Sequence, residues 1–189
     1  RLGRMLIAAD GFGCISELLV IVSAMSVQDP RERPDDQAAQ ADQAHKRFRH
    51  PRSDFLFWVA LWRYFEEKRQ ILSQNQLRRL SQREYLAFRR MREWRDIHTQ
   101  LVIACKKLGF RVPSKLSDNE SYEAIHKSLL AGLLDNIAKR DEGKEYFATR
   151  NRKVFLFPGS SQYRQPPTWL VAGVVVETTK TFARQCAAI

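Results

Sequence analysis

The chain has 189 residues, 44% of them hydrophobic, which is enough for one or two domains with an apolar core. Its 32 Lys and Arg residues outnumber 21 Asp and Glu residues, and the formal net charge of +11 favours a polyanionic partner such as RNA, DNA or an anionic membrane. The longest apolar run, Leu18–Val22, is far shorter than the roughly 20 residues of a membrane-spanning helix, so we expect no membrane segment.

The first third of the chain is predicted to be helical. Residues 16–27 are apolar nearly all round, which indicates a buried helix. Two prolines four residues apart predict a loop at 28–36, followed by a polar helix at about 37–49. The next helix is predicted to begin at residue 53 or 54, and its apolar side chains recur every three or four residues. The residues of this aromatic, core-facing side are Phe55, Trp58, Val59, Trp62 and Phe65.

Two patterns of the capping-box type predict the starts of two later helices. The first is Ser81–Glu84, and behind it apolar residues alternate at spacings of four and three until Gly109. This seam consists of Ala87, Met91, Trp94, His98, Leu101, Cys105 and Leu108. The pattern lasts only about three heptads, which favours an internal bundle helix over an extended coiled coil. The second box, Ser117–Glu120, predicts a helix through Ile137, and a domain boundary is expected near residues 112–117.

The last third of the chain changes to a β pattern. Branched and aromatic residues at 145–148, 154–157 and 169–176 predict strands, separated by turns rich in Gly, Ser and Pro. The segment 178–189 is predicted to be another strand or a short helix. Too few strands are evident to close a five-stranded barrel. The expected fold class is therefore α+β, a helical bundle followed by a helix and a partial barrel.

Nothing in the sequence predicts a catalytic, cofactor or metal site within the chain. The one Gly-Lys pair, Gly143 and Lys144, continues with Glu145 and lacks the upstream glycine of a phosphate-binding loop. The four histidines and three cysteines have no metal-ligand spacing, and reduced thiols are expected. His98 lies on the apolar seam and is interpreted as a hydrogen-bonded core or interface residue.

Two basic groups are candidates for nucleic-acid binding. Arg89, Arg92 and Arg95 follow one helical face, where guanidinium groups suit contacts with phosphates or bases. The alternative is a solvated face, in which Arg89 pairs with Glu93 and Arg92 with Asp96. The second group lies on loops of the β region, where small barrels bind single strands. It consists of Arg150, Arg152, Lys153, Tyr163 and Arg164.

Several strings resemble one helicase family. LGRML at 2–6, AMSVQDPRERP at 24–34 and SDFL at 53–56 resemble the helical accessory domain that follows the winged helix in DEAH-box RNA helicases, and SVQDPRERP resembles the bacterial HrpA type. FPGS at 157–160 and VETTK at 176–180 resemble the oligonucleotide-binding (OB) fold that closes the helicase core in this family.

This resemblance implies a ratchet helical bundle at residues 1–111, and a helix with a partial OB fold at 117–189. It implies that the chain comes from a longer cytoplasmic protein whose RecA-like and winged-helix domains lie upstream and partner this region. In that protein the ratchet and barrel hold single-stranded RNA, with DNA as the alternative, while the RecA-like domains hydrolyse ATP with Mg²⁺. No cofactor is expected in this chain itself.

By position, the resemblance places Arg89 and Arg92 near RNA, and Ser160 and Lys180 in barrel motifs that approach the strand. Arg90 departs from the small residue that is common at this position in eukaryotic relatives. The nucleic-acid-binding residues predicted overall are Arg89, Arg92, Arg95, Arg152, Ser160, Arg164 and Lys180. A second hypothesis is that the region mainly docks against the motor domains or a regulatory partner, with little direct RNA contact.

Overall fold

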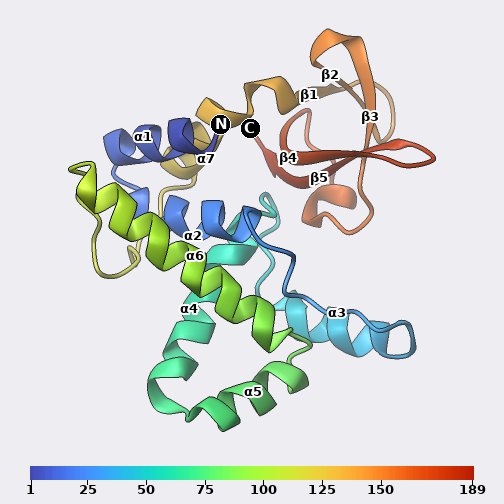
Figure 1. Cartoon of the computed structure of the whole chain (residues 1–189). Helices are drawn as coiled ribbons and strands as arrows, with labels where there is room; N and C mark the ends of the chain where they lie inside the picture. The colour runs from blue at the N-terminus through green and yellow to red at the C-terminus, as the bar shows by residue number, and fades with distance from the viewer.

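A computed structural model describes residues 1–189 and shows seven α-helices followed by five strands (Figure 1). The helices are α1 (Leu2–Phe12), α2 (Ile15–Met25), α3 (Ala38–Lys46), α4 (Leu56–Ile71), α5 (Gln74–Arg83), α6 (Phe88–Lys107) and α7 (Tyr122–Leu133). The strands are β1 (Ile137–Arg140), β2 (Glu145–Ala148), β3 (Arg152–Leu156), β4 (Trp169–Glu177) and β5 (Thr181–Ala188). The expected α+β class is confirmed. We call residues 1–133 the helical part and residues 137–188 the barrel.

Helix α2 is the centre of the helical part. Every residue from Ile15 to Ala24 is buried, as the apolar sequence predicts, because α1, α4, α6 and α7 all pack around it. Trp94 of α6 anchors this packing: its Nε1 donates to the Ser23 hydroxyl at 2.9 Å and to the Val20 carbonyl at 3.2 Å. The indole is thus both buried and fully hydrogen-bonded.

Helix α7 packs closely against α1. A Cβ at Gly132 would lie 2.6 Å from the Arg1 carbonyl oxygen and from Met5 Cγ, so this position requires glycine. The core of the helical part also includes three residues of α7, namely Ile125, Leu129 and Leu133. The division expected between residues 111 and 117 stays a prediction.

The five strands form a closed barrel in the order β1-β2-β3-β5-β4, with β1 paired to β4. All pairs are antiparallel except β3 with β5, which is parallel. The prediction that too few strands are present to close the barrel is therefore wrong, because residues 137–140 form a strand that was not predicted. Of the two alternatives for 178–189, the strand is confirmed, since 181–188 form the fifth strand. Alternating side chains of all five strands fill the interior, including buried Tyr146, Leu156 and Cys186.

Neither predicted capping box begins a helix. Ser81 lies inside α5, where its hydroxyl donates to the Leu77 carbonyl at 2.9 Å. Helix α6, which the first box was expected to begin, starts after Ala87 without a side-chain cap, whereas a capping box of Ser73 and Gln76 begins α5. Helix α7 is capped by Ser121 instead of Ser117. The seam of α6 buries Met91, Trp94 and Cys105 and leaves Leu108 exposed.

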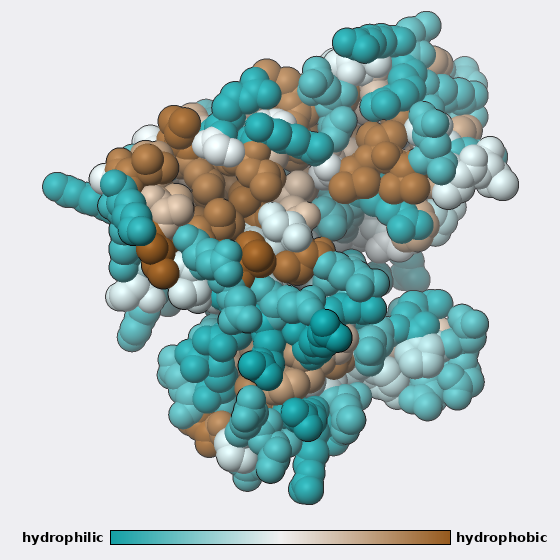
Figure 2. All heavy atoms as spheres, viewed as in Figure 1, coloured by the Kyte–Doolittle hydropathy of each residue, from teal (hydrophilic) through white to brown (hydrophobic).

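No helix combines the length and the apolar character needed to cross a membrane. In Figure 2, hydrophilic side chains cover the lower part of the view, around α3 and α5. Apolar side chains gather over the region of α1 and α7 and on part of the barrel. Among the exposed apolar residues, Ile7 and Phe12 of α1 are more than half exposed, at 64% and 51%.

A buried histidine lies in the helical part beside a tyrosine that contacts the barrel. The Nδ1 of His126 in α7 donates to the Tyr122 carbonyl at 2.6 Å, so its Nε2 accepts from the Ser53 hydroxyl at 2.7 Å. The Tyr122 hydroxyl donates to the Ala188 carbonyl at the end of β5. His126 is therefore neutral in the fold, and burial lowers its pKa from 6.5 to about 4, with Arg52 acting in the same direction.

We expect acid to destabilise the chain through His126. Between pH 6.5 and about 4 the unfolded histidine binds a proton that the folded one does not, so the free energy of unfolding falls as the pH is lowered through this window. The loss at this site is about 3 kcal/mol. Urea unfolding at pH 7 and pH 4.5 measures it, and the His126→Gln variant should show a smaller difference between the two pH values. An equal pH dependence in both proteins would contradict the assignment.

Candidate nucleic-acid interface

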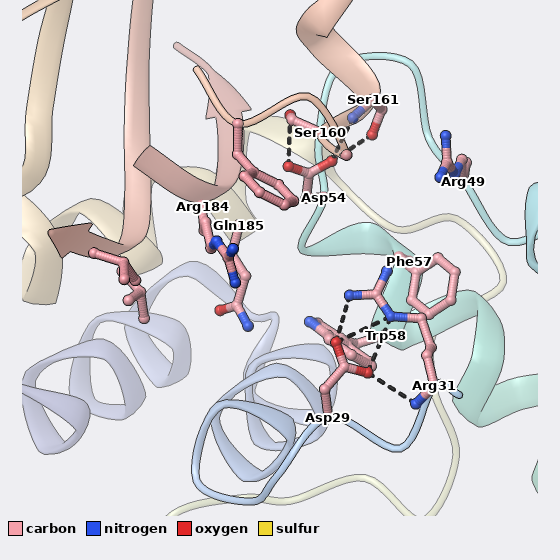
Figure 3. Close-up of a pocket in the computed structure, with 14 residues that line it drawn as sticks. Asp29, Arg31, Arg49, Asp54, Phe57, Trp58, Ser160, Ser161, Arg184 and Gln185 are labelled. Carbon is pink, nitrogen blue, oxygen red and sulfur yellow. Dashed lines mark hydrogen bonds and ion pairs between the residues drawn. The ribbon is translucent and has the colours of Figure 1, made fainter. Parts of the chain in front are cut away.

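A cleft lies between the helical part and the barrel, and encloses a cavity of about 340 Å³ (Figure 3). From the helical part it is lined by Asp29, Arg31, Arg49, Asp54, Phe57 and Trp58. From the barrel it is lined by Phe157, Gly159, Ser160, Ser161, Val174, Val176, Arg184 and Gln185. The cleft thus combines residues that lie between positions 29 and 185 of the sequence. Among them are Asp29 and Arg31 of the string at 24–34 and Asp54 of the string at 53–56, both of which resemble the helicases.

Asp54 fastens the two sides of the cleft together. It lies just before α4 and accepts four hydrogen bonds from barrel residues. The donors are the Ser160 hydroxyl at 2.7 Å, the Ser161 amide at 2.8 Å and hydroxyl, and the Cys186 amide at 2.9 Å. Figure 3 shows the carboxylate between this turn and the helical part. The carboxylate therefore fixes the turn after β3 and leaves Asp54 little capacity to bind anything else.

Arg31 is held on the opposite wall of the cavity. The Asp29 carboxylate accepts from the backbone amide of Arg31 at 2.9 Å and from the Arg31 guanidinium at 2.6 to 3.1 Å. The guanidinium lies 4.6 Å from the ring centroid of Phe57 and 5.0 Å from that of Trp58, at cation–π distance. Arg90 supports this loop by donating to the Asp29 carbonyl at 3.0 Å. The positive group is thus fixed in place before any ligand arrives.

Two further arginines of the cleft carry charge that no carboxylate neutralises by contact. Arg49 and Arg184 are exposed and form no ion pair. The Arg184 guanidinium lies 3.9 Å from the centroid of the Phe157 ring. Because both side chains border the cavity, they raise its positive potential and are available for phosphate contacts.

An aromatic row on the barrel leads to the cleft. Phe182 of β5 lies 5.9 Å from Phe157 and 6.5 Å from Phe155 of β3, measured between ring centroids. The Lys180 ammonium lies 4.6 Å from the Phe155 ring. Partly exposed rings beside cations are the arrangement on which proteins stack the bases of single strands. This row continues the cleft along the outer face of β3 and β5.

A second, shallower hollow of about 710 Å³ adjoins the cleft on the side of α3. The two share Arg49, Ser160 and Ser161, so they form one continuous surface. The second hollow adds the basic side chains of Lys46 and Arg164. Together the two hollows bring Arg49, Lys46 and Arg164 to one surface.

The structure brings three of the predicted site residues to this surface. Ser160 is buried and holds Asp54, Arg164 lines the second hollow, and Lys180 stands at the end of the aromatic row. Arg152 is exposed at the start of β3 but lines neither hollow. Ser160 was predicted to bind nucleic acid, but in the structure it is buried and its hydroxyl holds the turn after β3 against Asp54.

The three arginines predicted on α6 lie outside the cleft. Arg89 pairs with Glu93 at 3.1 Å, as the solvated-face alternative expects, and its side chain is 91% exposed. Arg95 pairs with Glu66 of α4 at 2.6 Å, whereas Arg92 forms no ion pair with Asp96. Arg92 and Arg95 border a separate hollow of about 250 Å³ beside α5. Their role in binding stays a prediction.

Sequence reasoning missed the arginines of the cleft, Arg31, Arg49 and Arg184. They are separated by 18 and 135 positions along the chain, and no spacing rule connects them. Arg31 lies within the string SVQDPRERP, which resembles the helicases, but its contact with Phe57 and Trp58 depends on how the loop folds back on α4.

Known proteins match both parts of the chain. The family model described as helicase associated domain (HA2), ratchet-like, matches residues 1–58, and the one described as oligonucleotide/oligosaccharide-binding (OB)-fold matches residues 125–189. The ATP-dependent RNA helicase HrpA of Escherichia coli (strain K12) is 44% identical over 190 residues, which is 100% of this chain. The resemblance to HrpA-type DEAH-box helicases is confirmed.

Two other relatives extend the comparison. The HrpA homolog of Haemophilus influenzae is 40% identical over 190 residues and 100% of this chain. The pre-mRNA-splicing factor ATP-dependent RNA helicase prp22 of Schizosaccharomyces pombe is 26% identical over 184 residues and 96% of this chain. The chain spans 14% of the length of each of the two bacterial proteins and 15% of prp22. It therefore corresponds to a region of such helicases that carries the HA2 and OB domains.

Proposed function

We propose that this chain is the accessory region of an ATP-dependent RNA helicase and grips single-stranded RNA in the cleft between its helical part and its barrel. The observation that carries the proposal is the convergence of Arg31, Arg49 and Arg184 with the aromatic row on one surface. Guanidinium groups bind phosphates, and unstacked bases can stack on the partly exposed rings. Grip and release of the strand would then be coupled to domains outside this chain.

The chemistry of the helicase belongs to those other domains. RecA-like domains of the same cytoplasmic protein would bind ATP and Mg²⁺, with the winged helix between them and this region. The residues of this chain do not form a phosphate-binding loop for ATP, because Gly143 and Lys144 lie in a turn before β2 and lack the upstream glycine of such a loop. Binding is the contribution of this region.

Direct titration of the 189-residue chain tests the proposal. We expect a labelled single-stranded RNA of about 12 nucleotides to bind, with fluorescence anisotropy as the measurement. Between about 50 and 200 mM salt, the logarithm of the binding constant should fall linearly with the logarithm of the salt concentration. The slope of this line should be about −0.7 for each phosphate neutralised. Binding that is absent at the lowest salt would refute the proposal, and competition with single-stranded DNA measures the preference for RNA.

A docking role is the second candidate, and the exposed apolar side chains on α1 favour it. Ile7 and Phe12 are more than half exposed although their helix packs against α7 and α2. In the longer protein, a neighbouring domain would cover them. If docking were the main role, RNA affinity of the longer protein would survive neutralisation of the cleft arginines, whereas substitution of Ile7 and Phe12 by serine would loosen its domain association.

A further inference from the structure

A second concentration of positive charge lies on α5, at the end of the helical part that lies away from the barrel (Figure 1). Arg78, Arg79 and Arg83 of this helix are exposed, and none of them forms an ion pair. The helix itself contains no Asp or Glu. It therefore carries three cations that no acidic residue of the same helix offsets.

Two hollows border α5 and share Leu72. The smaller, of about 250 Å³, is lined by Phe65, Arg69, Leu72, Gln74, Leu77, Phe88, Arg92 and Arg95. The larger, of about 540 Å³, is lined by Leu72, Gln76, Arg79, Gln82 and Arg83. We call these lining residues, together with Arg78, the α5 surface. Its charged side chains are all arginines, and no carboxylate lines either hollow.

Contacts with the neighbouring helices leave most of this charge uncompensated. Glu66 of α4 pairs with both Arg69 and Arg95, at 3.0 and 2.6 Å, so one carboxylate serves two guanidinium groups. The exposed side chain of Arg92 forms no ion pair. Four arginines of the α5 surface are therefore free to contact a polyanion, namely Arg78, Arg79, Arg83 and Arg92.

The α5 surface differs from the cleft because it has no freely exposed aromatic ring. Phe65 is 2% exposed, and the partly exposed ring of Phe88 lies beneath the Arg78 guanidinium, 5.4 Å from the ring centroid. Single strands bind to exposed rings because their bases are unstacked. In a duplex the bases stack on one another, and the backbone and the groove edges remain accessible. Cations and amides without rings therefore suit a duplex better than a single strand.

We infer that the α5 surface binds the phosphate backbone of an RNA duplex, at a site separate from the cleft. Arg78, Arg79, Arg83 and Arg92 contact phosphates, and the side-chain amide of Gln82 donates to a ribose hydroxyl. The inference rests on the proposed function in one respect, namely that the nucleic acid is RNA. The double-stranded part of an RNA would then be held on α5 while a single-stranded part lies in the cleft.

A blunt-ended, labelled RNA duplex of about 20 base pairs tests the surface, because it offers the cleft no single strand. Replacing Arg78, Arg79 and Arg83 with glutamine should weaken duplex binding about tenfold at about 100 mM salt and lower the salt dependence by the equivalent of about three phosphates. Affinity for the single strand of about 12 nucleotides should fall by less than about twofold. Fluorescence anisotropy measures all three quantities.

A double variant protects this test against a folding defect. Arg78 packs on Phe88, whereas the side chains of Arg79 and Arg83 are exposed and form no ion pair. Arg79→Gln with Arg83→Gln should therefore leave the fold intact, and it should still weaken duplex binding about fivefold. Circular dichroism verifies that both variants are folded.

The matched control removes the same charge from another part of the molecule. Arg4, Lys107 and Arg111 are exposed, form no ion pair and line neither the cleft nor the hollows beside α5. Replacing all three with glutamine should change duplex affinity by less than about twofold. A specific surface on α5 thus predicts different results for two variants of equal net charge.

The outcomes separate the duplex surface from the proposed function. A duplex that does not bind at about 50 mM salt, or that binds equally weakly to the α5 and control variants, overturns the inference and leaves single-strand binding intact. Equal losses for duplex and single strand in the α5 variant also overturn it, because the two ligands would then share one site. Duplex binding that only the α5 variant loses, in a protein that binds no single strand, supports the surface and refutes the proposed function.

Discussion

Replacing both Arg49 and Arg184 with glutamate is expected to weaken RNA binding about 100-fold at moderate salt and to lower the salt dependence by the equivalent of about two phosphates. Both side chains border the cavity, both are exposed, and neither has a carboxylate partner that the substitution would strand. The folded structure should therefore survive while the positive potential of the cleft is lost. Fluorescence anisotropy across a salt series measures both effects.

The matched control carries the same change of charge far from the cleft. Arg4 of α1 and Lys107 of α6 are exposed and line none of the hollows of the cleft. Arg4→Glu with Lys107→Glu should reduce affinity only slightly, through the net charge of the molecule. Equal losses in the two double variants would show that the overall charge of +11 attracts RNA without a defined site.

Replacing Asp54 with alanine is expected to lower the free energy of unfolding by about 3 kcal/mol. The substitution removes four hydrogen bonds at once and leaves the Cys186 amide and the Ser160 hydroxyl without an acceptor between the two parts of the molecule. The turn at 158–161 would also be freed, so RNA binding should weaken. Urea unfolding followed by circular dichroism measures the stability, and anisotropy the binding.

Two comparison variants separate the position of Asp54 from its charge. Asp54→Asn keeps one acceptor oxygen and should retain about half of the stability that alanine loses. Asp118→Ala removes a carboxylate from an exposed loop and should change stability by less than about 0.5 kcal/mol. An Asp54→Ala protein as stable as the Asp118→Ala protein would show that the hydrogen bonds of Asp54 to the barrel do not stabilise the fold.

Local sequence patterns predicted those elements whose own residues decide their structure. The helix around Leu18–Val22 is apolar on every side and is buried in α2, and the branched residues of 169–176 form β4. Patterns failed where several residues suit one role. Ser81 and Ser117 each match a capping box, but Ser81 lies inside α5, and Ser121 caps the helix that Ser117 was expected to begin. Strand β1 has only four residues and no alternation strong enough to separate it from the helix before it.

By itself the sequence determined the α+β class, a positive charge suited to nucleic acid and, through strings such as SVQDPRERP, the resemblance to the helicases. Only the tertiary structure decided where that charge is concentrated. Arg31, Arg49 and Arg184 come from separate segments, and Asp54 brings their elements together by binding the turn of the barrel. The arginines of α6, adjacent in sequence, are partly neutralised by Glu93 and Glu66. Spacing along a chain fixes neighbours on one helix, whereas electrostatic potential depends on distances in space between elements that the sequence does not order.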